Sequence, residues 1–334
     1  MRDDAEIIEG RDGYLFLTGG AHAVADFLSG RRQPAPASVA AFVANQQARA
    51  AFCRARGLPF TTWIFPEKLY CLRDLVPELG PLNSLYQSAY RPAMDDATAA
   101  DVQYPVAALD ARPRCFLMTD THYSPLGDAM VAGQVLERLA PGAGLALRRA
   151  ARAAMTERRK VTGDLGSKFT PPRRETVSDL DPLRPHRIGS NGIIGNLGAM
   201  YLVDSPEAAA DQTLLIFGDS FFRVLLPHLA VHYRRIVFCR SPYFHAEMVD
   251  AVAPSAILCG MAERYLAECL PDDQRPHFLA IGALRGKRAA PDAVYAELFG
   301  RYIDQRGLLS PAVMAGVGAG DDRRAQTTGE GDAA

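Results

Sequence analysis

Residues 214–229 read LLIFGDSFFRVLLPHL, in which four apolar residues, a sharp Gly-Asp-Ser turn and a second largely apolar run follow one another. There is no room for a longer loop between the two apolar runs. The pattern predicts a buried strand that passes directly into a helix. In an open parallel sheet, functional groups gather outside the carboxyl ends of the strands. We therefore expect Ser220 to stand at such an edge.

The segments that follow this turn alternate between strand-like and helix-like patterns. Continuous apolar strands separated by helices indicate a parallel sheet that is covered on both faces. The expected strands are TLLIF (213–217), RRIVFC (234–239) and SAILCG (255–260), and the expected helices are 221–233, 247–253 and 262–270.

The N-terminal half supplies further elements of the same kind. A helix is expected over 36–57, a strand in LPFTTWIFPEK (58–68) that ends at Pro66, and a strand at RCFLM (114–118). The run 124–139 predicts a helix with Ser124 as its cap and Pro125 at its first position. Residues 150–212 show no clear pattern. We predict one α/β domain over 1–315 and a disordered, polar C-terminal tail over 316–334.

Composition excludes several classes of function. The chain has 334 residues, of which 48% are hydrophobic and 22% charged, and its net charge is -1. These values are typical of a globular protein and give no broad attraction to nucleic acid or anionic lipid. The six cysteines have no metal-ligand spacing, so we expect neither a metal ion nor a cofactor. No apolar run is long enough for a transmembrane segment. The acidic N-terminus lacks an apolar signal core, which predicts a cytoplasmic chain or a start further upstream.

Ser220 has two possible roles at the start of its helix. A helix N-terminus carries unpaired N–H groups and partial positive charge, which suits an oxyanion and therefore a nucleophilic serine. Serine is also a common helix cap, and the tripeptide alone does not separate the two interpretations.

A nucleophilic serine needs a base, and His122 is the strongest candidate. It lies in RCFLMTDTHYSPLGDAMVAG (114–133), two residues after Asp120, in another predicted strand-to-helix turn. A two-residue step in extended chain puts both side chains on one side, so the carboxylate can orient the imidazole. The alternative is an Asp/His pair that only bonds loop backbone.

Together, DTHYSPLG (120–127) and LLIFGDSF (214–221) resemble the SGNH-hydrolase-like domain of the alginate O-acetyltransferase family of AlgJ and AlgX. Further matches are GRDGYLFL (10–17), FPEKLY (65–70), GDLGSKF (163–169) and APSAILCGMAERYL (253–266). The resemblance implies an SGNH-hydrolase-like three-layer sandwich with a mostly parallel central sheet. It also implies Ser220 as nucleophile, His122 as base and Asp120 as its orienter. Tyr123 stands where the family usually has tryptophan, and the family is periplasmic.

Further residues are candidates for contacts with substrate. Asn191 and Asn196 in SNGIIGN (190–196) are candidates for an oxyanion donor, or ordinary turn residues. Arg264 follows a predicted strand beside Glu263 and lines the pocket or forms a surface ion pair. Trp63 is expected in the core, Tyr243 is a candidate for stacking on sugar, and the DGYLFL segment is expected to pack as a strand.

We expect a serine-dependent O-acetyltransferase that modifies hydroxyls of a polysaccharide, as in exopolysaccharide or alginate modification. The family resemblance implies a polysaccharide acceptor and an acetyl donor supplied by a membrane acyltransferase. Two alternatives stay open: a carbohydrate acetylesterase with the same triad, and a non-catalytic glycan-binding scaffold of a polysaccharide assembly complex.

Overall fold

The computed structural model describes residues 6–109, 114–154 and 158–303, so the predicted tail lies outside the described residues. Among them, a central sheet of seven strands has the order β4-β3-β11-β9-β10-β8-β7. Its first five strands run parallel, while β8 pairs antiparallel with β10 and with β7. The strands are β3 (Phe60–Phe65), β4 (Val102–Gln103), β7 (Arg187–Ser190), β8 (Met200–Asp204), β9 (Ala210–Gly218), β10 (Tyr233–Arg240) and β11 (Ala256–Ala262).

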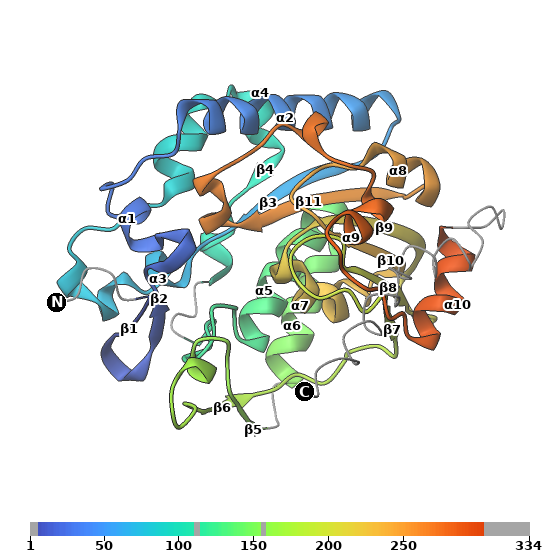
Figure 1. The fold of residues 1–334 in the computed structure, drawn as a ribbon. Coiled ribbons are helices and arrows are strands. Elements are labelled where there is room, and N and C mark those ends of the chain that lie inside the picture. The colour runs from blue at the N-terminus through green and yellow to red at the C-terminus, as the bar shows by residue number, and fades with distance from the viewer. Residues whose placement is uncertain (1–5, 110–113, 155–157, 304–334) are drawn as a thin grey trace, which may run out of the picture.

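Helices cover both faces of this sheet, as Figure 1 shows. Side chains alternate along β9, so Leu214 and Ile216 enter one core with α5 and α7. Leu215 and Phe217 enter a second core with α8 and α10. The two cores explain why the strand is apolar throughout. The predicted three-layer α/β sandwich with a mostly parallel sheet is therefore confirmed.

The longer helices are α2 (Pro36–Ala55), α5 (Pro125–Leu139), α6 (Ala143–Ala154), α7 (Ser220–Leu229), α8 (Ala246–Val252) and α10 (Ala293–Tyr302). Shorter helices are α1 (Val24–Leu28), α3 (Lys68–Cys71), α4 (Asp96–Ala100) and α9 (Ile281–Leu284). Two small antiparallel pairs lie outside the main sheet: β1 (Ile7–Glu9) with β2 (Leu15–Leu17), and β5 (Arg158–Val161) with β6 (Glu175–Ser178). In the described part of the chain, no helix has the length and apolarity to cross a membrane.

The sequence prediction was wrong for two segments and extended a helix too far in a third. RCFLM forms only an isolated bridge between Phe116 and Tyr123. Side chains bind much of its backbone, while the Leu15 N–H of β2 donates to the Met118 carbonyl without forming a ladder. The helix expected over 221–233 ends at Leu229, since Tyr233 already begins β10. The helix expected over 262–270 is the short 3₁₀ turn η9 (Glu263–Ala267), in which the Arg264 N–H donates to a side chain.

Candidate active site

Ser220 is the first residue of α7, directly after the end of β9. The turn is tight at Gly218, where a Cβ would lie 2.6 Å from the carbonyl oxygen of Gly260 in the neighbouring strand. Asp219, not Ser220, is the helix cap, because its side chain accepts from the Phe221 N–H at 3.0 Å. The same carboxylate accepts from the Ala262 N–H at 2.7 Å and joins the ends of β9 and β11. The cap interpretation of Ser220 is therefore wrong.

The Asp120–His122 segment is a loop that leads into α5, whose cap is Ser124 as predicted. His122 Nδ1 lies 2.7 Å from Asp120 Oδ1, and the His122 backbone N–H donates to the same oxygen at 2.9 Å. Both side chains are largely buried, with 17% and 18% of their surfaces exposed. The carboxylate thus holds the imidazole from one side, as the two-residue spacing predicts.

The other ring nitrogen faces Ser220. His122 Nε2 lies 2.9 Å from Ser220 Oγ, within the range of a hydrogen bond. The Phe221 ring packs against the imidazole with a centroid distance of 4.9 Å. The predicted convergence of Ser220, His122 and Asp120 is therefore observed, in the order that a serine nucleophile and its base require.

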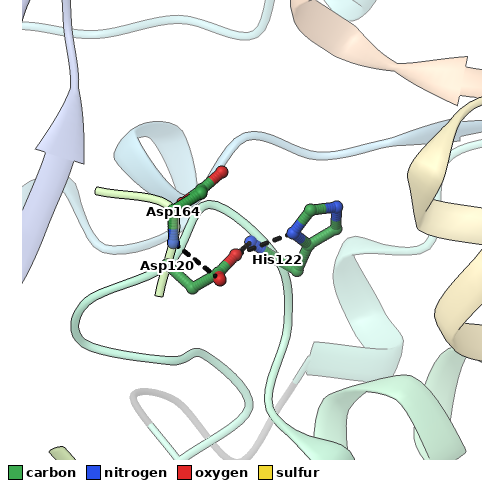
Figure 2. A group of neighbouring side chains, drawn as sticks. All are labelled: Asp120, His122 and Asp164. Carbon is green, nitrogen blue, oxygen red and sulfur yellow. Dashed lines mark hydrogen bonds and ion pairs between the residues drawn. The ribbon is translucent and has the colours of Figure 1, made fainter. Parts of the chain in front are cut away.

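Asp164, in the GDLGSKF segment, interlocks with this loop. Its backbone N–H donates to Asp120 Oδ2 at 3.0 Å. In return its carboxylate accepts from the Thr121 N–H at 2.7 Å and from Thr121 Oγ1 at 2.5 Å. Figure 2 shows Asp164 and His122 on either side of the Asp120 carboxylate. The two segments therefore fix each other, and both oxygens of Asp120 have partners.

Asp120, His122 and Asp164 also offer metal-ligand atoms within 4.8 Å of one another. All four carboxylate oxygens in this group, however, already accept hydrogen bonds from protein groups. A metal ion would have to replace these bonds. The arrangement thus favours a hydrogen-bonded network over a metal centre.

Glycines allow the two segments to approach closely. A Cβ at Gly163 would lie 2.2 Å from the Thr119 carbonyl oxygen, and one at Gly166 would lie 2.5 Å from that of Arg173. The Leu165 and Gly166 N–H groups donate to the Thr119 carbonyl at 3.1 and 2.8 Å. No larger residue fits at either glycine without moving backbone.

Two buried charges bind the backbone on the other side of the loop. Lys68 Nζ donates to the carbonyls of Leu117, Met118 and Asp120 at 2.9, 3.3 and 2.5 Å. Glu175 accepts from the Met118 and Thr119 N–H groups at 2.8 and 2.7 Å. These side chains, together with the Leu15 N–H of β2 that donates to the Met118 carbonyl at 2.8 Å, bind the backbone of RCFLM in place of a strand ladder.

The Asp120 carboxyl is held in its ionised form. Burial by itself raises its pKa, but the hydrogen bonds and charge of His122 and the Asp164 N–H outweigh burial. The pKa of Asp120 therefore lies below its ordinary value. An ionised Asp120 can stabilise the imidazolium that forms when His122 accepts a proton.

A cavity of about 290 Å³ opens in front of Ser220 and His122. Asn196 and Arg264 line it, as does Leu17 of β2, so the DGYLFL segment also reaches the site. Asn191 does not: its side chain donates to the Gly198 carbonyl and accepts from the Ile193 and Met200 N–H groups. The structure corrects the assignment of Asn191, which stabilises a turn.

Arg264 is buried rather than part of a surface ion pair. Its Nε lies 2.8 Å from Glu67 Oε1, and both side chains are less than 10% exposed. Its Nη2 is buried and has no hydrogen-bond partner among the described residues. Glu263 faces away from this cavity and bonds Ser84 and Tyr104. Trp63 lies in the core as predicted.

The structure contains a second Ser-His-acid arrangement, which has the contacts of a triad but no access to the cavity in front of Ser220. Ser241 Oγ lies 2.7 Å from His245 Nε2, and His245 Nδ1 lies 3.0 Å from Glu247 Oε1. Ser241 and His245 are both 0% exposed, and neither lines the cavity in front of Ser220. No substrate can reach this serine without displacing the core. Access to a cavity thus distinguishes Ser220.

No protein-family model matches the chain, and a search of curated proteins found no match. Several solved structures are similar. PatB1 of Bacillus cereus with a sulfonyl adduct has a TM-score of 0.53 and 10% identity, covering 78% of this chain and 94% of that chain. The AlgJ O-acetyltransferase domain of Pseudomonas putida has a TM-score of 0.45 and 16% identity, covering 82% and 97%. AlgX of Pseudomonas aeruginosa has a TM-score of 0.47 and 12% identity, covering 81% and 64%. At these identities the likeness to PatB1 shows a shared fold. That fold agrees with the predicted SGNH-hydrolase-like class.

Proposed function

We propose that the protein is a serine-dependent O-acyltransferase that moves an acetyl group onto a hydroxyl of a polysaccharide. The observation that carries the proposal is the position of His122, which bonds Asp120 with one ring nitrogen and Ser220 with the other. The choice of a sugar hydroxyl as acceptor rests on the sequence motifs that resemble the AlgJ and AlgX family.

In the first half of the reaction, Ser220 Oγ attacks the carbonyl carbon of the acyl donor. His122 Nε2 takes the hydroxyl proton, and Asp120 stabilises the imidazolium. The imidazolium then gives this proton to the leaving group as the donor's ester bond breaks. The product is an acyl-Ser220 ester.

In the second half, a sugar hydroxyl replaces the leaving group. His122 removes the hydroxyl proton, the sugar oxygen attacks the acyl carbon, and Ser220 leaves with the proton returned from His122. Two donors suit the tetrahedral oxyanion. They are the Ser220 N–H in the first turn of α7 and the unpartnered Nη2 of Arg264. Asn196 is the second side-chain candidate in the same cavity.

The experiment separates an acetyltransferase from an esterase and from a non-catalytic scaffold. A fluorophosphonate probe should label Ser220 in the wild type, and a protein that is not labelled would be the non-catalytic scaffold. A small acetyl ester is then supplied with and without oligosaccharides, and both acetate and acetyl-sugar are followed. A transferase forms acetyl-sugar at the expense of acetate, because a positioned hydroxyl is equivalent to about 10⁵ M or more. Acetate release unaffected by every acceptor would identify an esterase.

A further inference from the structure

A second cavity, of about 250 Å³, adjoins the one in front of Ser220 and shares Asn196 and Tyr265 with it. It lies between α2, the ends of β9 and β11, and the segments that follow β10 and η9. Gly218 and Asp219, the two residues before Ser220, are part of its wall. A group attached to Ser220 therefore has this cavity beside it.

The wall is mainly apolar and the space is larger than an acetyl group needs. Apolar side chains from different elements line it, among them Phe42, Leu197, Met261 and Leu270. A cavity of about 150 Å³ holds benzene, which has six non-hydrogen atoms. By proportion, this cavity holds about ten non-hydrogen atoms, against three for an acetyl group.

One polar group in the wall has no partner. Gln46 is 1% exposed, and its Oε1 accepts from Thr62 Oγ1 at 2.6 Å, which fixes the amide. Its Nε2 has no hydrogen-bond partner among the described residues. The neighbouring Asn45 and Arg49 bond other protein groups. Because buried donors are normally satisfied, a ligand that supplies an acceptor oxygen suits this position.

We propose that this second cavity, which we call the acyl cavity, binds the chain of an acyl donor of about six to eight carbons that also carries an acceptor oxygen. The chain lies against the apolar wall, and its oxygen accepts from Gln46 Nε2. The inference rests on the proposed function, because Ser220 must carry the acyl group. It extends that function from acetyl to longer, oxygen-bearing acyl groups.

The first test measures binding without chemistry, in the Ser220→Ala protein. Trp63 is the single tryptophan, and it pairs in register with Gly260, which lines the acyl cavity. The probe is 2-octanone, a nine-atom ketone that cannot be hydrolysed, with acetone as the small control. We expect saturable quenching of Trp63 by 2-octanone only. Affinity should fall at least tenfold in Leu197→Phe, which fills the cavity, and in the Gln46→Leu/Thr62→Val pair, which removes the donor together with its buried partner.

Leu284→Phe makes the same change at a residue that is 70% exposed and is not part of the lining, so it should bind like the parent. Thermal unfolding confirms that each variant is folded. Quenching that does not saturate, or that is equal in Leu197→Phe and Leu284→Phe, would overturn the proposal.

The second test compares kcat/KM for p-nitrophenyl octanoate and p-nitrophenyl acetate in proteins that retain Ser220. Leu197→Phe should lower the octanoate-to-acetate ratio at least tenfold, whereas Leu284→Phe should leave it unchanged. An unchanged ratio in Leu197→Phe would contradict the proposal. If Ser220 is not the nucleophile, either neither ester is hydrolysed or Ser220→Ala hydrolyses both as the parent does, while 2-octanone still binds, so the two failures are distinguishable.

Discussion

His122 and Ser220 are 98 positions apart in the chain, yet His122 Nε2 lies 2.9 Å from Ser220 Oγ. If this contact is the catalytic one, Ser220→Ala should reduce acyl turnover about 10⁴-fold or more, because triad members act as a unit. Asp120→Asn should cost less but still cripple the base. Stability should change by less than about 0.5 kcal/mol in Ser220→Ala, since Asp219 is the cap.

The matched control is Ser241→Ala, which removes the serine of the buried second arrangement. Turnover and fluorophosphonate labelling should remain, because no substrate reaches Ser241. Stability should fall by about 1–3 kcal/mol, since His245 loses a buried partner. Labelling that persists in Ser220→Ala and disappears in Ser241→Ala would reverse the assignment.

Asp164→Ala should lower kcat about tenfold to 10²-fold while KM stays nearly constant. The change removes both acceptors of Thr121, so the loop that carries Asp120 and His122 loses its fixed position. Asp250→Ala is the control, because this carboxylate is 68% exposed and its ion pair with Arg56 is 3.9 Å long. A rise in KM with kcat unchanged would assign Asp164 to substrate binding instead.

The sequence predicts what depends on local pattern. The buried strand before Gly218 and the helix after it follow from apolar periodicity, and the Asp120–His122 relation follows from a two-residue step. The side chains that hold the Asp120–His122 loop do not follow from local pattern, because Asp164, Lys68 and Glu175 reach the loop from distant segments. Asp164 lies in GDLGSKF and Lys68 in FPEKLY, which the sequence offers only as motifs without a role, and Glu175 lies in neither.

The RCFLM segment shows a second reason for failure. An apolar run next to a turn predicts a strand, but a strand also needs a neighbour in the sheet. Here Lys68 and Glu175 bind the backbone at several positions, and β2 contributes the Leu15 N–H rather than a ladder. Asn191 shows the same dependence on distant residues. Whether it forms a turn or donates to an oxyanion depends on where Gly198 and Met200 lie, and no local pattern shows that position.

Arg264 provides a test of the oxyanion donor. Its removal alone leaves Glu67 buried and unpaired, which should destabilise the protein by about 3–5 kcal/mol. We therefore compare Glu67→Gln with the Glu67→Gln/Arg264→Met pair, in which no buried charge is left. The pair should show a further decrease in kcat of about 10²–10³-fold, typical of a lost oxyanion donor. Equal kcat values in the two proteins would exclude Arg264 as the oxyanion donor, and Asn196 would then be the remaining side-chain candidate.

Lys68 predicts an alkaline limit to activity. Burial lowers the pKa of its ammonium to about 8, although nearby carboxylates act in the opposite direction. The ammonium has three N–H donors for three carbonyls, and the neutral amine has only two. Above about pH 8 one of the three backbone carbonyls therefore faces the lone pair of the neutral Lys68 amine instead of an N–H donor. The loop that carries Asp120 should then shift. We expect kcat to fall with an apparent pKa near 8.

Stability should not follow the same course. The pKa of Lys68 is lower in the folded than in the unfolded chain, so between about pH 8 and 10.5 the unfolded chain binds more protons. In that window the Lys68 contribution to stability rises with pH. Lys68→Met should have low kcat at every pH, and its pH profile should lack the fall in kcat near pH 8. If the fall in kcat near pH 8 persists in Lys68→Met, another group causes it. Thermal unfolding measured alongside separates loss of activity from loss of fold.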